Sequence, residues 1–351
     1  MATMMGAYKI KSQFNTEYSL PTRRIVRMLS ENARLSVTEI AKRLGISRPT
    51  VKERLRRLEA DLGMRYTLEI DELALGLVSP HLINIRFRNE PDYTRIKELM
   101  LRSYIPQLAL VTSGYYNMIV YANAFSTNEY ARWDKSMRIL LAEYGAEWRP
   151  SEVVHRQLGF FPIRNDTIDR SHMDGKYKLM LKLLNDNSRL SFQQLSKATG
   201  MHFNTVKYRY GKLMDMGYVK RPTVTLPMLR KLTFMSFFAR YTPVLGYEAS
   251  SANARLAFTT DDSDSLISRY LICSPLIGND DFFTLGVFDS RQAAYEADVE
   301  YHRNVLANHN VKLRYAEVKE VLFGRLPIRS IDTKKEYATI IWNPDFNANI
   351  P

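Results

Sequence analysis

The sequence contains a single cysteine, Cys273, among its 351 residues. One cysteine cannot form an intramolecular disulfide bond, which suits a reducing compartment, and we interpret Cys273 as a small buried residue of a strand. No run approaches the roughly 18 apolar residues of a membrane-spanning helix. The start of the chain, MATMMGAYKIKSQFN, lacks the charged-then-apolar order of a signal peptide. The expected location is therefore the cytoplasm, in association with the nucleoid.

Motifs for common catalytic and metal sites are also missing. The sequence has no glycine-rich phosphate or dinucleotide loop, no serine nucleophile elbow and no HExxH motif. The six histidines are scattered without the close spacing of metal ligands, and we interpret each as a surface or packing residue. We therefore predict a protein that is not an enzyme and has no metal site and no cofactor. The histidines are His81, His155, His172, His202, His302 and His309.

Positive charge is the main feature of the composition. The formal net charge is +13, and 45% of the residues are hydrophobic. A folded chain of this length has room for two or more domains. The charge favours a polyanionic partner, with nucleic acid before an anionic membrane surface.

Residues 35–58, LSVTEIAKRLGISRPTVKERLRRL, have the pattern of a helix-turn-helix. Gly45 supplies the permissive backbone of a tight turn, and Ser47 is a good N-cap for the second helix. Pro49 falls in the first turn of that helix, where a missing N–H has no cost. The apolar residues of the second helix would pack on the first. Its outward line is basic and consists of Arg48, Lys52 and Arg56.

A basic helix of this kind can lie in the major groove, where Arg and Lys donate to guanine while neighbouring groups contact phosphates. Glu53 has two interpretations, a contact with a cytosine amine or a pair with Arg57 one turn later, and the pair is favoured. An ordinary helical hairpin with solvated charges is the alternative for a single copy. The predicted DNA-binding residues of this copy are Ser47, Arg48, Pro49, Thr50, Lys52, Glu53 and Arg56.

The pattern recurs 155 positions later, in residues 190–213, LSFQQLSKATGMHFNTVKYRYGKL. Identical residues at one offset, among them Gly45 and Gly200, indicate a duplicated module. The basic line is weaker here, because Phe203 replaces Arg48. We predict that the two copies read different sequences, or that the second copy makes a protein contact. The predicted DNA-binding residues of the second copy are Asn204, Thr205, Lys207 and Tyr208.

A second pattern follows each helix-turn-helix. Residues 65–70, and later residues 218–225, alternate like short strands and are predicted wings. Residues 81–159 then read strand, helix, two strands around a turn at Gly114, helix and strand. This βαββαβ order is that of a ferredoxin-like sheet with both helices on one face. The other face must be buried, and a second copy usually buries it.

These patterns predict an α+β fold with two copies of a winged helix-turn-helix followed by a ferredoxin-like domain. Each half is expected to have its own core. The predicted divisions are a flexible N-terminal arm (1–21), the first winged helix-turn-helix (22–77) and ferredoxin-like domain (78–160), a linker (161–175), the second winged helix-turn-helix (176–231) and ferredoxin-like domain (232–330), and a C-terminal tail (331–351).

The chain resembles the Lrp/AsnC family of prokaryotic transcription regulators. The resemblance rests on residues 35–59, on the connector IDELALGL (70–77) and on the hairpin VTSGYYNMIVYA (111–122). It implies that each half corresponds to one family protomer, that the protein binds double-stranded DNA, and that the ferredoxin-like domains assemble into a homo-oligomer, a dimer or higher. A sirohaem decarboxylase on the same architecture and a non-specific chromatin-organising protein are the alternatives.

The resemblance also implies a response to a small effector such as an amino acid. In the family the hairpin turn commonly reads Gly-x-x-Asp, and the second hairpin keeps this pattern whereas the first has asparagine in place of the aspartate. The candidate effector-binding residues are Gly114, Tyr116, Asn117, Gly278 and Asp281.

Overall fold

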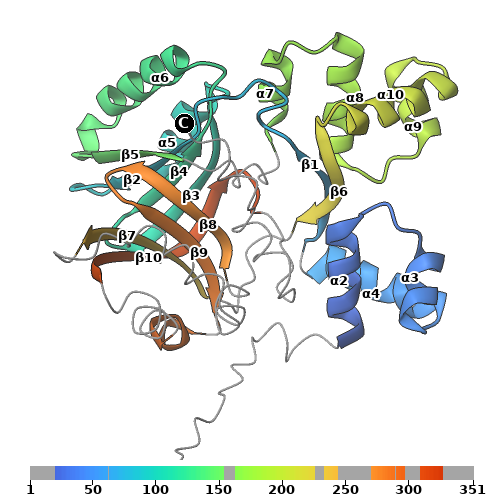
Figure 1. The fold of residues 1–351 in the computed structure, drawn as a ribbon, viewed down its shortest axis with the longest axis horizontal. Helices are drawn as coiled ribbons and strands as arrows, with labels where there is room; N and C mark the ends of the chain where they lie inside the picture. Colours follow the sequence, from blue (N-terminus) through green and yellow to red (C-terminus); the bar gives the residue numbers. More distant parts are fainter. Residues whose placement is uncertain are drawn as a thin grey trace, which may run out of the picture.

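A computed structural model describes residues 20–61, 63–153, 163–225, 233–243, 270–288, 290–296 and 309–326. The predicted C-terminal tail and nearly all of the predicted N-terminal arm lie outside the described residues. The described chain forms two parts, a pair of helix-turn-helix domains and a closed β-sheet (Figure 1). Among the described residues, no helix is both long and apolar enough to cross a lipid bilayer.

The first helix-turn-helix consists of α2 (Leu20–Glu31), α3 (Val37–Leu44) and α4 (Arg48–Asp61). Ser36 begins α3 with a capping box, and Gly45 ends it with φ 65°, a backbone conformation that glycine adopts without strain. The Ser47 hydroxyl accepts from the Thr50 N–H at 3.2 Å. The predicted turn and N-cap are therefore confirmed.

The second helix-turn-helix repeats this arrangement with α8 (Gly175–Asp186), α9 (Phe192–Thr199) and α10 (Phe203–Asp215). Ser191 again forms a capping box, and Gly200 ends α9 with φ 67°. The imidazole of His202 accepts from the Asn204 N–H and caps α10. The segment predicted as a linker is not wholly irregular, because it contains α7 (Asn165–Arg170).

The two predicted wing strands, β1 (Arg65–Ile70) and β6 (Val219–Thr225), pair with each other instead of forming a wing within each half. The pairing is antiparallel and places Thr67 opposite Thr223, which occupies the same place in the second half because the strand there lies one residue further along than the offset of 155. The sequence predicted each strand without a partner, since an apolar pattern shows which face is buried and not which strand lies beside it. The resulting ribbon lies between the two helical domains (Figure 1).

Reciprocal hydrogen bonds extend this junction. Arg34 donates to the Leu190 carbonyl at 3.0 Å, and its counterpart Arg189 donates to the Leu35 carbonyl at 2.6 Å. The Thr67 hydroxyl donates to the Asn185 carbonyl, and the Thr223 hydroxyl donates to the Ser30 carbonyl. The two helix-turn-helix domains are therefore related by an approximate two-fold axis within one chain.

The two ferredoxin-like repeats supply the closed sheet. In the first repeat the predicted order of elements is observed. In the second repeat the structure describes four strands and a helical segment at residues 291–296, and residues 244–269 and 297–308 lie outside the described residues. The first repeat contains β2 (His81–Arg86), α5 (Tyr93–Leu101), β3 (Pro106–Gly114), β4 (Met118–Ala122), α6 (Thr127–Leu140), the short 3-10 helix η1 (Ala142–Tyr144) and β5 (Glu147–Val153). The second contains β7 (Thr233–Pro243), β8 (Tyr270–Gly278), β9 (Phe282–Phe288) and β10 (His309–Phe323).

The strands close in the order β10-β3-β4-β2-β5-β8-β9-β7, and the halves meet at β3–β10 and β5–β8. The interior is an apolar core from both halves, and a second core lies between the first sheet and its helices α5 and α6. The face that needed cover is thus buried by the second copy, and this copy belongs to the same chain.

The connector between β1 and β2 carries a buried carboxylate. Glu72 is 5% exposed. Its carboxylate accepts hydrogen bonds from the Tyr121 hydroxyl of β4 at 2.6 Å and from the side-chain amide of Asn123, which directly follows β4. Burial raises the pKa of Glu72 to about 7, against the hydrogen bonds from Tyr121 and Asn123. The neighbouring Asp71 N–H donates to the Tyr218 carbonyl, so this connector joins the second helical domain to the closed sheet.

Replacing Glu72 with Gln should remove a pH dependence of stability. Between the ordinary pKa of 4.5 and about 7, the folded chain binds more protons than the unfolded chain, so the free energy of unfolding falls as pH rises. At pH 8 the Glu72→Gln variant should be more stable than the parent by about 3 kcal/mol, with no difference below about pH 4. Urea unfolding at a series of pH values measures the free energy of unfolding of parent and variant. If this free energy depends on pH in the same way in both proteins, the prediction is wrong. Glu90→Gln, at an exposed position, is the control.

Candidate nucleic-acid interface

The outward face of α4 presents most of the residues predicted to bind DNA. Arg48, Pro49 and Lys52 are exposed, and Thr50 is half-buried. The hydroxyls of Ser47 and Thr50 lie 2.7 Å apart at the start of the helix. The opposite face packs into the domain core through Val51, Leu55 and Leu58. The predicted division of α4 into a buried apolar face and an exposed basic face is therefore observed.

Glu53 pairs with arginines of its own helix. Arg57 donates to Glu53 at 2.8 Å and Arg56 donates at 3.0 Å. The hydrogen bonds from Arg56 and then Arg57 lower the pKa of Glu53 to about 2. The favoured Glu53–Arg57 pair is present, while Arg56 is shared between this carboxylate and solvent. Arg54 points to the flank, where it donates to the Thr22 hydroxyl at 2.7 Å.

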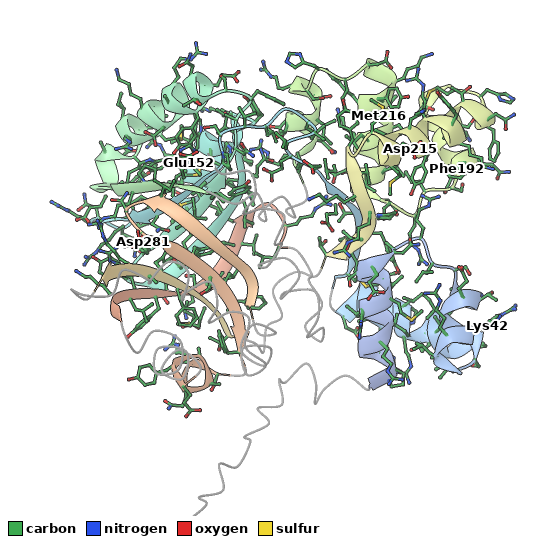
Figure 2. The ribbon with its side chains drawn as sticks, in the orientation of Figure 1. Lys42, Glu152, Phe192, Asp215, Met216 and Asp281 are labelled. Carbon is green, nitrogen blue, oxygen red and sulfur yellow. The ribbon has the colours of Figure 1, made fainter. Side chains whose placement is uncertain are left out.

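The corresponding face of α10 is aromatic rather than basic. Asn204, Thr205 and Lys207 are exposed, and Tyr208 is 63% exposed with the Lys212 ammonium 5.8 Å from its ring centroid. Phe203, in the place of Arg48, is 40% exposed and contacts Phe192 of α9. Of the outward basic line Arg48, Lys52 and Arg56, only Lys52 has a charged counterpart in α10, which is Lys207. Figure 2 shows Phe192 and, in the first domain, Lys42 on the side away from the closed sheet.

The candidate effector residues lie partly at the two strand pairs where the halves meet, β3–β10 and β5–β8, and partly in the hairpins and the interior of the closed sheet. Gly114 lies opposite Ala316, and Gly278 lies opposite Ser151. A Cβ at Gly114 would be 2.7 Å from the Tyr315 carbonyl oxygen, at a φ of 130°. The glycine is therefore needed for the close approach of the two halves, and the same holds less tightly at Gly278.

The other three candidates do not gather around one site. Tyr116 is fully buried inside the closed sheet. The Asn117 side chain accepts from the Phe87 N–H at 2.8 Å and fixes the first hairpin. Asp281 is half-buried in the second hairpin, where its N–H donates to the Ala239 carbonyl (Figure 2).

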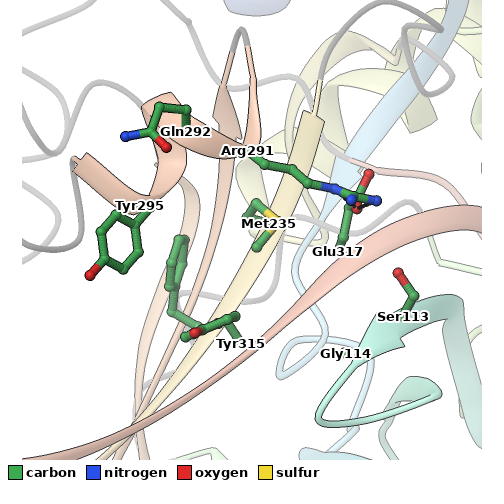
Figure 3. A pocket seen from close by; sticks show the side chains of 9 residues that line it. Ser113, Gly114, Met235, Arg291, Gln292, Tyr295, Tyr315 and Glu317 are labelled. Atoms are coloured by element: carbon green, nitrogen blue, oxygen red, sulfur yellow. Dashed lines mark hydrogen bonds and ion pairs between the residues drawn. The ribbon is translucent and has the colours of Figure 1, made fainter.

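A cavity of about 430 Å³ lies beside the paired strands β3 and β10 (Figure 3). Of the predicted effector residues, Gly114 alone is among the residues that line it. Arg291 pairs with Glu317 there, and Lys319 pairs with the same carboxylate at 2.7 Å. These hydrogen bonds lower the pKa of Glu317 although burial opposes them. The remaining lining residues are Ser113, Met235, Phe237, Gln292, Tyr295 and Tyr315.

Sequence reasoning did not find these lining residues, because they come from four distant segments with no shared motif. The described histidines do not form a cluster either. His81 stacks on Tyr130 with ring centroids 3.5 Å apart, and burial lowers the pKa of His81. His155 and His302 lie outside the described residues. Within the described ranges, no group of three or more His, Cys, Asp or Glu side chains is arranged to bind a metal ion.

Comparison with known proteins agrees with the two helical domains. The family of winged helix-turn-helix DNA-binding domains matches residues 21–61 and 174–220. The transcriptional regulator LrpC of Bacillus subtilis is 36% identical over 85 residues, which are 24% of this chain and 55% of LrpC. An uncharacterized HTH-type transcriptional regulator of Pyrococcus furiosus is 29% identical over 117 residues, 33% of this chain and 78% of the relative. The chain thus spans about half the length of LrpC, and the resemblance to the Lrp/AsnC family is confirmed.

A solved structure matches nearly the whole chain. The siroheme decarboxylase NirDL covers 92% of this chain and 97% of its own with a TM-score of 0.52 and 11% identity, which establishes a shared fold. The prediction that the chain is not an enzyme is therefore wrong as it stood. It rested on missing motifs, yet a protein with this fold is an enzyme.

Proposed function

We propose that this chain, whose two winged helix-turn-helix domains are of the Lrp type, is a transcriptional regulator that binds double-stranded DNA with two different recognition helices. The single observation that carries the proposal is the exposed basic face of α4, with Arg48 and Lys52 outward and Ser47 at the helix start. A helix of this kind places its first turns against base edges in the major groove.

The intramolecular pairing of the helical domains supports a bipartite binding site. The ribbon of β1 and β6 and the reciprocal Arg34 and Arg189 contacts give one chain the approximate two-fold arrangement that dimeric helix-turn-helix proteins use for two half-sites. The half-sites would differ, because α10 presents Phe203 and Tyr208 where α4 presents Arg48 and Glu53. We infer an asymmetric DNA site, read mainly by α4.

Arg48→Ala should weaken binding to a footprinted DNA site by about 1–3 kcal/mol if a base contact is lost. Lys207→Ala should weaken specific and scrambled duplexes alike, because one phosphate contact carries little sequence information. Fluorescence anisotropy at fixed salt, with both duplexes, separates the two effects. Arg95→Ala on α5 removes the same charge away from the helical domains and serves as the control. Equal affinities of Arg48→Ala and the parent in low salt would refute the role of α4.

We further propose that the cavity beside Gly114 binds an effector with the chemistry of an apolar amino acid. Arg291 and Glu317 place opposite charges side by side on its wall, so a zwitterion could pair its carboxylate with the first and its ammonium with the second. Met235, Phe237 and Tyr295 would contact an apolar side chain. A cavity of about 430 Å³ is within the size range of small-molecule sites.

Gln292→Trp should fill this cavity from an exposed helix position and abolish effector binding. Each common amino acid is titrated as the probe by calorimetry, and the parent should bind at least one apolar member that the variant does not bind. Lys135→Trp, an equally bulky change at an exposed position of α6, should bind like the parent. If the parent binds none of them, or if Gln292→Trp binds as the parent does, the effector site is not this cavity.

A second candidate function is the decarboxylation of sirohaem, favoured by the match of NirDL over 92% of the chain. NirDL has also been solved with an iron-uroporphyrin III analogue, so this fold can accommodate a tetrapyrrole. Titration of the purified chain with sirohaem tests the candidate directly. Saturable changes in the absorption bands, followed by a loss of CO2 from the tetrapyrrole in mass spectra, would support this function. Unchanged absorption spectra would rule it out.

A further inference from the structure

We propose that a buried polar cluster at the centre of the closed sheet makes the pairing of the two halves heterotypic, so that a second half accepts a first half and rejects another second half. The question arises because both halves carry the edge strands of a seam, β3 and β5 in the first and β8 and β10 in the second. Two chains could in principle pair first with first and second with second. This inference does not depend on the proposed DNA binding.

The halves meet around an axis that equivalent residues share. Gly114 and Gly278 occupy the same position in the two hairpins, and each lies against the last strand of the other half. Tyr116 and Asp280 follow them by two residues, and they touch: the Tyr116 hydroxyl donates to the Asp280 carboxylate at 3.3 Å. Equivalent residues of two related units contact each other only beside the axis that relates the units.

The second half places a carboxylate beside this axis, whereas the first half places hydrogen-bond donors there. Asp280 is fully buried and pairs with Arg314 at 2.8 Å, and Asn84 of the first half donates to it at 3.3 Å. Tyr116 packs edge-on against Phe238 of the second half with ring centroids 5.1 Å apart. Asn84 and Phe238 are themselves equivalent by strand register. The carboxylate therefore meets two donors, Tyr116 and Asn84, and both belong to the other half.

Pairing of two second halves would replace these donors with unsuitable groups. Asp280 would face a second Asp280 in place of Tyr116, and Phe238 in place of Asn84. Two carboxylates about 3 Å apart in a buried site cannot both ionise. Each would keep its own Arg314, but the hydrogen bonds from Tyr116 and Asn84 would be missing. Pairing of two first halves brings no such conflict. It would, however, leave two second halves to pair with each other.

The reciprocal contacts between the two helical domains do not distinguish a first half from a second half. Arg34 and Arg189 are the same residue type at equivalent positions, as are Thr67 and Thr223. These contacts would form between any two copies of the module. Selection therefore lies in the closed sheet, and its consequence is that α4 is always combined with α10.

Tyr116→Asp in the full chain reproduces the rejected contact, since it places a carboxylate opposite Asp280. Tyr116→Asn is the matched control, because it removes the same ring without adding charge. Tyr116→Asp combined with Asp280→Asn restores a single carboxylate beside Arg314. We expect Tyr116→Asp to unfold at least about 4 °C below both Tyr116→Asn and the double variant in thermal scans followed by circular dichroism. A double variant more stable than its parent single variant indicates like-charge repulsion, which a purely steric role of Tyr116 would not produce.

Equal unfolding temperatures of Tyr116→Asp and Tyr116→Asn would overturn the proposal, as would a double variant no more stable than Tyr116→Asp. If the loss of the ring prevents folding of all three, the same comparison is made at Asn84, whose variants keep Tyr116. Asn84→Asp should then unfold below Asn84→Asp combined with Asp280→Asn. The reverse order, or equality, would also overturn the proposal.

Discussion

The two seams between the halves, β3–β10 and β5–β8, are the interaction on which the rest of the structure depends. They close the sheet, and closure buries the apolar core that neither half could bury alone. The approach is close enough that Gly114 cannot carry a side chain without meeting the Tyr315 carbonyl.

Several contacts link the closed sheet to the helical pair. The connector places Glu72 against Tyr121 and Asn123, while Arg325, just after β10, donates to the Asn185 carbonyl at 3.2 Å. That carbonyl also accepts from Thr67, next to the axis of the ribbon. Arg325 and the Asn185 carbonyl therefore connect the end of β10 to the ribbon between the two helical domains.

The sequence predicted what local chemistry determines. Ser47 marks a helix start through its hydroxyl, Gly45 and its counterpart Gly200 mark helix ends through their left-handed backbone, and the alternation of apolar residues predicted the strands in order. It did not predict which strand pairs with β1, because period-two alternation fixes which face is buried and leaves the partner open. The Glu53–Arg57 pair followed from helical spacing, whereas the contact of Tyr116 with Asp280 joins residues 164 positions apart and has no local sign.

Duplication explains why one chain combines near-symmetry with pronounced local differences. Contacts that hold the two modules together, such as those of Arg34 and Arg189, need the same chemistry on both sides and have kept it. Positions on the exposed faces of α4 and α10 or at the centre of the sheet are free to differ once both copies lie in one chain, since a change in one copy no longer appears twice. Phe203 in place of Arg48 and Asp280 in place of Tyr116 are such differences. A fold shared with an enzyme therefore does not by itself assign a reaction, because function depends on the side chains of a site and these are where the two copies differ.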